Sequence, residues 1–171
     1  MFLNYSKSVQ GKFDLVVFQI SAKEYAVPIT NVHSITTPDI LENYENRNEF
    51  IKGIINSSGC IIPVINSQKK FNSKKLNSHT STQTKIIIIE VQGHTVGLII
   101  DKAPKFLSLK FDNIFIFPQV PKNKGFLAIG KIEERQIILV NTDNFFTNKE
   151  ENEIKNIYKI INYKSQFKSA V

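Results

Sequence analysis

Short apolar runs, rich in β-branched residues and separated by turn residues, dominate the chain. Leu15–Ile20 and Ile86–Val91 are two such runs, and each is followed by a polar or small cluster, at 21–24 and at 92–94. Runs of this length and composition, bounded in this way, are typical of strands. No run approaches the roughly 20 apolar residues needed to span a bilayer. The pattern therefore predicts a mainly β protein in which helix is minor.

The strand pattern also repeats along the chain. Three blocks in the first half match three blocks in the second half in the same order, which indicates an internal duplication. The matches are Leu15–Ile20 with Ile86–Val91 and Tyr25–Ile29 with Val96–Ile100, both 71 residues apart, and Ile62–Asn66 with Ile137–Asn141, 75 residues apart.

This duplication predicts one domain over 12–148 that consists of two small β-barrel subdomains packed together. Each barrel, SH3-like or OB-like, has about five strands, because closure removes exposed sheet edges. We expect the subdomains to cover about 12–66 and 85–146, with the exchange of strands between them left open. The segment between them, 67–84, is polar and basic and is expected to form a surface loop.

Two segments favour helix. Thr147 or Asn148 can cap a helix over 148–164, whose first turns carry three glutamates, a favourable arrangement at the positive end of the helix dipole. A short helix over 45–52, ending at Gly53, is also expected. The tail helix is amphipathic, and packing on the protein's own surface is favoured over binding a partner or a membrane surface. Its apolar stripe consists of Ile154, Ile157, Tyr158 and Ile161.

The net charge of +7 raises the question of nucleic acid. The segment 67–85 holds five lysines and no acid, so it contributes +5 and leaves only +2 for the rest of the chain. Only two arginines are present, whereas a phosphate-binding surface favours arginine. A barrel that binds single-stranded nucleic acid remains a remote alternative, which salt-sensitive oligonucleotide binding would test. Its aromatic candidates are Phe111, Phe115 and Phe117, beside Lys110.

The residues of catalytic and metal sites are scattered. His33, His79 and His94 lie in unrelated contexts, and we expect His79 and His94 to be solvated. The single cysteine, Cys60, excludes an internal disulfide and a zinc site built from several cysteines, and is expected to be a small buried residue of a strand. No nucleophile elbow or phosphate-binding glycine loop is present. The sequence therefore predicts a non-enzymatic protein without a cofactor or metal.

Four blocks of sequence match, in order, the motifs of a known family. They are Phe13–Ile35; Phe50–Ile65, similar to F-I-x-G-[VIL]-x-N-x-R-G-x-[IV]-[IV]-P-V; His94–Leu109, similar to V-G-[LI]-[IV]-[VI]-D-x-V-x-x-V-L-x-[LI]; and Phe126–Gly130 with Ile137–Asp143, similar to a closing glycine turn and strand. Together, over about 13–146, these blocks resemble the CheW family of chemotaxis coupling proteins.

The resemblance implies a fold and a function. The family's fold is two five-stranded β-barrels with a hydrophobic groove between them, and its members are non-enzymatic adaptors. They couple the cytoplasmic tips of methyl-accepting chemoreceptors to the regulatory domain of the histidine kinase CheA, and other CheW-like proteins in array rings are further candidate partners. We therefore expect a cytoplasmic protein that reaches the inner face of the membrane through receptor arrays, without direct insertion and without nucleic acid.

The resemblance also transfers roles to individual positions. Val32 is expected to face a receptor or the adjoining interface, Ile35 to lie near the kinase contact, and Asn56 to tie a loop by side-chain hydrogen bonds. The candidates for partner binding are Val32, Ser34, Ile35, Lys52, Asn56 and Ser58. Gly53, Gly59 and Pro63 are expected to serve backbone geometry. Val27, Ile29, Leu98 and Ile100 are candidates for groove or core, and core is favoured.

Two of these positions depart from the family. Ser34 stands where the family has an acidic residue, and Ser58 stands where it has the arginine of N-x-R-G. Loss of both charges weakens electrostatic complementarity with partners more than it destabilises a fold. An alternative to the ordinary coupling protein is therefore a divergent paralogue that builds arrays and binds receptors or kinase selectively without activating the kinase.

Overall fold

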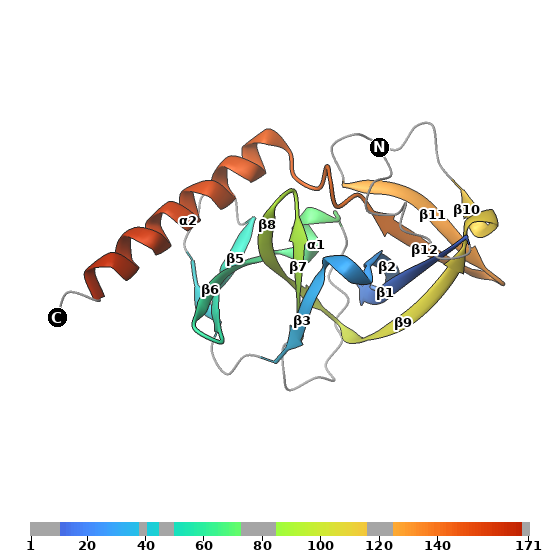
Figure 1. The fold of residues 1–171 in the computed structure, drawn as a ribbon, viewed down its shortest axis with the longest axis horizontal. Coiled ribbons are helices and arrows are strands. Elements are labelled where there is room, and N and C mark those ends of the chain that lie inside the picture. The colour runs from blue at the N-terminus through green and yellow to red at the C-terminus, as the bar shows by residue number, and fades with distance from the viewer. Residues whose placement is uncertain (1–10, 38–40, 45–49, 73–84, 116–124, 169–171) are drawn as a thin grey trace.

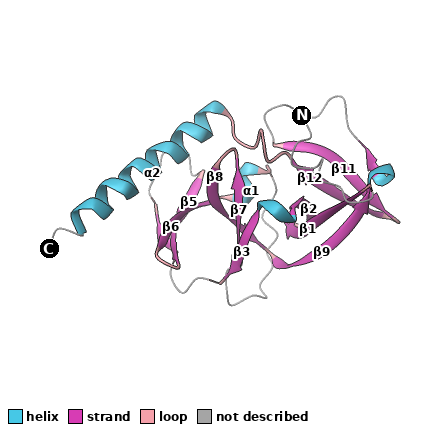
Figure 2. Ribbon diagram, viewed as in Figure 1, coloured by secondary structure: helices cyan, strands magenta, loops and turns pink. Residues whose placement is uncertain are grey.

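The computed structural model describes residues 11–37, 41–44, 50–72, 85–115 and 125–168, with side chains as far as residue 162. It confirms a mainly β chain with few helices (Figures 1 and 2). The strands are β1 (Lys12–Ile20), β2 (Lys23–Pro28), β3 (Val32–Thr36), β4 (Glu42–Asn43), β5 (Ile51–Ser57), β6 (Cys60–Ile65), β7 (Lys85–Val91), β8 (His94–Ile100), β9 (Lys102–Lys110), β10 (Ile114–Phe115), β11 (Phe126–Ile132) and β12 (Arg135–Val140). The helices are the 3-10 turns η1 (Ile29–Asn31) and η2 (Phe111–Asn113), the single turn α1 (Ser67–Lys70) and the long α2 (Asn148–Lys168).

The strands form two sheets that lie side by side (Figure 1). One has the order β10-β11-β12-β2-β1-β9 and the other β3-β7-β8-β6-β5-β4, so each has six strands where the sequence predicts about five. The sixth is a two-residue strand, β10 or β4, at the edge of its sheet. Each sheet combines strands from both halves of the sequence. Closure of either sheet into a barrel stays a prediction.

The internal repeat fixes the same strand pairing in both sheets. Val17 pairs with Ala26 in the β1–β2 hairpin, and 71 residues later Ile88 pairs with Gly97 in the β7–β8 hairpin. In each sheet the second strand of this hairpin runs parallel to a strand from the other half of the sequence, β12 beside β2 and β6 beside β8. The two sheets are therefore copies of one arrangement, built with exchanged hairpins.

The apolar runs are continuous because the central strands are buried on both faces. In β1, Val16 and Phe18 belong to the largest core cluster, whereas Leu15 and Val17 belong to a second cluster on the opposite face of the sheet. The residues of β7 divide in the same way between the largest cluster and a third. The largest core therefore contains side chains from β1 and β2 of one sheet and from β7 and β8 of the other.

Helix α2 confirms the tail helix and its cap. The Thr147 hydroxyl accepts from the Glu150 amide (3.3 Å), and the Glu150 carboxylate accepts from the Thr147 amide (2.8 Å). This reciprocal pair is a capping box. Ile154 and Ile157 are fully buried in the largest core, so the apolar stripe packs on the protein's own strands. Figure 1 shows α2 running past β5 and β8 and extending beyond the sheet at its C-terminal end.

A buried lysine joins α1 to the start of α2. The Lys70 side chain is only 1% exposed, and its Nζ lies 2.6 Å from the Glu150 carboxylate. The same Nζ lies over the rings of Phe145 and Phe146, at 4.7 and 5.6 Å from their centroids. Burial lowers the pKa of Lys70, and the Glu150 carboxylate opposes that shift. Part of the segment expected to be a surface loop is therefore core, while 73–84 lies outside the described residues.

Three further expectations are wrong or only partly tested. The short helix expected over 45–52 is contradicted at Ile51 and Lys52, which lie in β5 because their side chains alternate between buried and exposed opposite β6; 45–49 lie outside the described residues. Cys60 is exposed rather than buried, because it is the first residue of β6 beside a hairpin turn. The His94 side chain is only 16% exposed, because α2 packs against it; His79 lies outside the described residues.

Candidate partner-binding surface

Three of the candidate partner residues lie on β3, an edge strand. Within the described residues β3 pairs only with β7, and the register shifts between Val32 and Ser34. Val32 is half-buried, Ser34 is exposed and Ile35 is 46% exposed. The start of the strand is held by the Asn31 side-chain amide, which donates to the Glu90 carbonyl (2.9 Å). The edge therefore presents polar and apolar side chains together with one row of backbone groups that no other described strand pairs.

The remaining partner candidates lie in the β5–β6 hairpin. Ser58 and Gly59 both have positive φ, 52° and 83°, as a two-residue type I′ turn requires. The Asn56 side chain accepts from the Gly59 amide (2.9 Å), which is the loop-tying role predicted for it. Ser58 and Lys52 are exposed, so both side chains are accessible to a partner.

The other two backbone-geometry candidates lie in the strands of the same hairpin. A Cβ at Gly53 would collide with the Glu42 carbonyl of β4, so a close approach of two strands explains this glycine. Pro63 pairs with Ile54 of β5, and the parallel pairing of β6 with β8 begins at the next residue, Val64. A residue that lacks an amide proton is tolerated there because the ladder to β8 has not yet begun.

A pocket brings β3 and this hairpin together. Ser34 and His33 line it from β3, and Ser57 lines it from the turn end of β5. The rest of its wall consists of Cys60, Ile61 and Ile62 from β6, Ile88 from β7, Thr95 from β8 and Tyr158 from α2. We call it the β3 pocket. Ser34 and Ser57, the neighbour of Ser58, therefore border the same apolar pocket.

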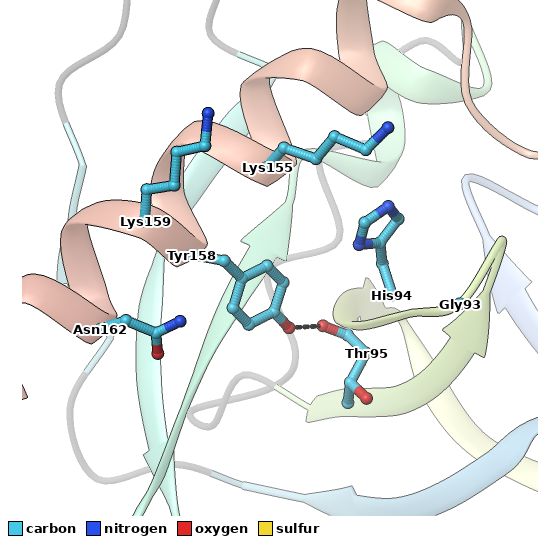
Figure 3. Close-up of a pocket in the computed structure, with 7 residues that line it drawn as sticks. All are labelled: Gly93, His94, Thr95, Lys155, Tyr158, Lys159 and Asn162. Carbon is cyan, nitrogen blue, oxygen red and sulfur yellow. Dashed lines mark hydrogen bonds between the residues drawn. The ribbon is translucent and has the colours of Figure 1, made fainter.

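Tyr158 and Thr95 also line a second pocket, which we call the α2 pocket (Figure 3). The α2 pocket is lined by 93–95 of the β7–β8 turn and by Lys155, Tyr158, Lys159 and Asn162 of α2. The Tyr158 hydroxyl donates to the Thr95 carbonyl, and burial raises the pKa of Tyr158 to about 12. The sequence predicted Tyr158 in the packed stripe of the tail helix but missed that it lines two surface pockets.

The four candidates for groove or core differ in their burial. Val27, Leu98 and Ile100 are buried in the largest core, whereas Ile29 is 43% exposed at η1. A further exposed apolar side chain, that of Phe106, was not identified from the sequence. Phe106 is 73% exposed on β9, which is the edge strand of the other sheet and pairs only with β1 within the described residues. The repeat could have found it, because Phe106 lies 71 residues after Ile35.

The aromatic residues considered for nucleic acid lie elsewhere. Phe111 and Phe115 are more than half exposed, and Phe111 packs against Phe13 with ring centroids 5.9 Å apart. Phe117 lies outside the described residues. Among the described residues, no group of three or more His, Cys, Asp or Glu side chains could hold a metal ion. The described helices include none that is long and apolar enough to cross a membrane.

Comparison with known proteins identifies the family. The model of the CheW-like domain matches residues 14–150. The chain belongs to the CheW-like family. Similar relatives include the chemotaxis protein CheW of Klebsiella aerogenes, 26% identical over 85% of this chain and 89% of the relative, and that of Bacillus subtilis, 28% identical over 74% and 80%. A crystal structure of the scaffolding protein TtCheW from Thermoanaerobacter tengcongensis is also similar, with 30% identity, a TM-score of 0.68, and coverage of 80% of this chain and 89% of that one.

Family membership confirms the resemblance to the CheW family and the prediction of a non-enzymatic protein. CheW proteins are non-enzymatic chemotaxis adaptors or scaffolds, so this chain belongs to an adaptor family rather than to an enzyme family. The match to the CheW-like domain includes β3, the β5–β6 hairpin and β9. It ends at Glu150, so Lys155, Tyr158 and Lys159 of α2 lie beyond it.

Proposed function

We propose that this protein couples the cytoplasmic tips of methyl-accepting chemoreceptors to the regulatory domain of the kinase CheA. The observation that carries the proposal is the pair of equivalent edge strands, β3 and β9, in a member of an adaptor family. Each exposes a large apolar side chain at the corresponding position, Ile35 or Phe106. Exposed apolar side chains on sheet edges are suited to bury an interface with another protein.

Both contacts expected from the sequence lie on the β3 edge, and the equivalent β9 edge is a further surface for a partner of an adaptor. In this proposal Val32 contacts the receptor or the adjoining interface, and Ile35 contacts the kinase regulatory domain. Ile29, exposed at η1 next to β3, extends the apolar surface. Binding to receptors places the protein at the inner face of the membrane, and other CheW-like proteins can occupy the same edges in array rings.

The experiment is calorimetric titration of this protein with the isolated CheA regulatory domain from the same cell. We expect micromolar affinity or better, and a loss of about tenfold or more in Ile35→Glu, because a charge at an apolar contact remains unpaired. Phe115→Glu is the control, since Phe115 is 52% exposed and lies on β10 of the other sheet. Equal weakening by both substitutions, or none by either, would contradict the assignment of Ile35 to the kinase contact.

A second candidate function is a selective, array-building paralogue that does not activate the kinase. The neutral β3 pocket favours it, because Ser34 replaces the acidic residue and Ser58, beside the pocket residue Ser57, replaces the arginine. The test restores both charges with Ser34→Glu and Ser58→Arg, singly and together, and measures affinity for receptor fragments and for the kinase domain. No change in affinity for any partner would count against this candidate.

A further inference from the structure

The described part of α2 carries a positive charge that no described residue neutralises. No acidic residue follows Glu153 in the sequence. Lys155 is paired, with its Nζ 2.6 Å from the Glu151 carboxylate, and His94 Nε2 lies 3.5 Å from the same carboxylate. Lys159, one turn further, is exposed and has no ion pair with any residue that the structure describes. The Glu151 carboxylate therefore contacts both Lys155 and His94, and Lys159 is left without a counter-charge among the described residues.

The spacing of the two lysines makes a negative ligand favourable. Lys155 and Lys159 are four residues apart, and like charges at this spacing destabilise a helix. Figure 3 shows both side chains on α2 above the Tyr158 ring, with Lys155 on the side of His94 and Lys159 farther from it. A carboxylate placed between them would remove the repulsion and complete the row that begins with Glu151.

The surroundings of these charges select the kind of ligand. The His94 ring stacks against the Tyr158 ring, with centroids 6.3 Å apart and planes 19° apart, so one wall of the pocket is aromatic. Ile160, 44% exposed, follows Lys159 directly. Lysine is a point charge without the bidentate geometry with which arginine grips phosphates, and arginine is absent from this helix. Acidic groups next to apolar ones, as on an amphipathic protein segment, match this surface better than a nucleic acid.

We propose that the α2 pocket docks an acidic, amphipathic segment of a protein partner, with carboxylates on Lys155 and Lys159 and an apolar side chain against His94 and Tyr158. The charge of the two lysines is complementary to the carboxylates of such a segment. The inference does not depend on the adaptor proposal, because Lys155, Tyr158 and Lys159 of α2 lie beyond the CheW-like match. A segment held here would lie beside the β3 pocket, with which the α2 pocket shares Thr95 and Tyr158.

The test is a titration of the isotope-labelled full chain with a capped helical peptide that carries Leu on one face and Glu on the other. NMR shifts should appear at the amides of 93–95 and 155–162. The affinity should fall about tenfold in Lys159→Glu. Lys131→Glu is the matched control, because Lys131 is an exposed lysine of β11 in the other sheet. Lys159→Gln should give an intermediate loss, and circular dichroism checks that each variant is folded.

Four results would overturn the inference. The first is equal binding of a peptide in which Gln replaces every Glu, and the second is equal weakening by Lys131→Glu. The third is the absence of shifts at the α2 pocket of the folded wild-type protein. The fourth is displacement of the peptide by a single-stranded oligonucleotide or by anionic phospholipid vesicles at lower concentration than by free acidic peptide, which would assign the lysines to another class of ligand.

Discussion

Replacement of Lys70 by Met should destabilise the protein by about 2 kcal/mol. The substitution keeps the length of the side chain but removes a charge-assisted hydrogen bond, worth about 1.5–3 kcal/mol, and the cation–π contacts with Phe145 and Phe146, worth about 0.5–2 kcal/mol. The relief of burying an ammonium group offsets part of this loss. Glu150 is 22% exposed and still caps α2, so the carboxylate left behind can reach water.

Chemical denaturation monitored by circular dichroism measures this change, and about 2 kcal/mol corresponds to a fall of about 6 °C in Tm for a chain of this size. Lys131→Met, at an exposed lysine, is the control and should change stability by less than about 0.5 kcal/mol. A double-mutant cycle with Glu150→Gln should show coupling of about 1–2 kcal/mol. Additive effects of the two substitutions, or a Lys70→Met variant as stable as the wild type, would refute the reasoning.

Three more predictions concern the fold. Because burial raises the pKa of Tyr25 and Tyr158 to about 12, against about 10 in the unfolded chain, the stability they contribute is complete below pH 10 and is lost as pH rises toward 12. Absorbance titration of phenolate should show late ionisation, and Tyr158→Phe should reduce its amplitude by one tyrosine; ionisation of all tyrosines near pH 10 in folded protein would contradict this. Gly97→Ala should cost about 1–3 kcal/mol in denaturant unfolding, since its Cβ would lie 2.8 Å from Ile86 Cγ2; an unchanged midpoint would show that the strands adjust freely. Asn56→Ala should cost about 1 kcal/mol and speed amide exchange in its turn, and unchanged exchange there would exclude the hydrogen bond.

The β1–β2 and β7–β8 hairpins were predictable because the repeat includes both of their strands. A hairpin register is set by the alternation of side chains and by the length of the turn, and both recur 71 residues later. The cap and the buried stripe of α2 followed from residue type and spacing in the same way. Local sequence pattern was sufficient wherever the contacts lie within one hairpin or one helix.

The burial of Lys70 could not be predicted, because it depends on a partner 80 residues away. The lysine lies in a polar segment, and only the fold places Glu150 and the two phenylalanine rings around it. His94 is covered for a similar reason, since α2 returns across the β7–β8 turn.

The candidate site divides between local and long-range effects. Asn56 and Gly59 were predictable because they act within one turn. The β3 pocket was not, because it requires β3, the β5–β6 hairpin and Tyr158 of α2 to converge. Phe106 was overlooked although the repeat aligned it with Ile35, because an aromatic residue in a strand is more often buried than exposed.

The most direct test of the adaptor proposal asks whether this protein joins two partners that do not otherwise associate. Gel filtration of the CheA regulatory domain with a soluble chemoreceptor signalling fragment, with and without this protein, makes that measurement. We predict that the kinase domain and the receptor fragment elute together only when the protein is present, and separately again with Ile35→Glu. Separate elution in the presence of folded wild-type protein would contradict the account.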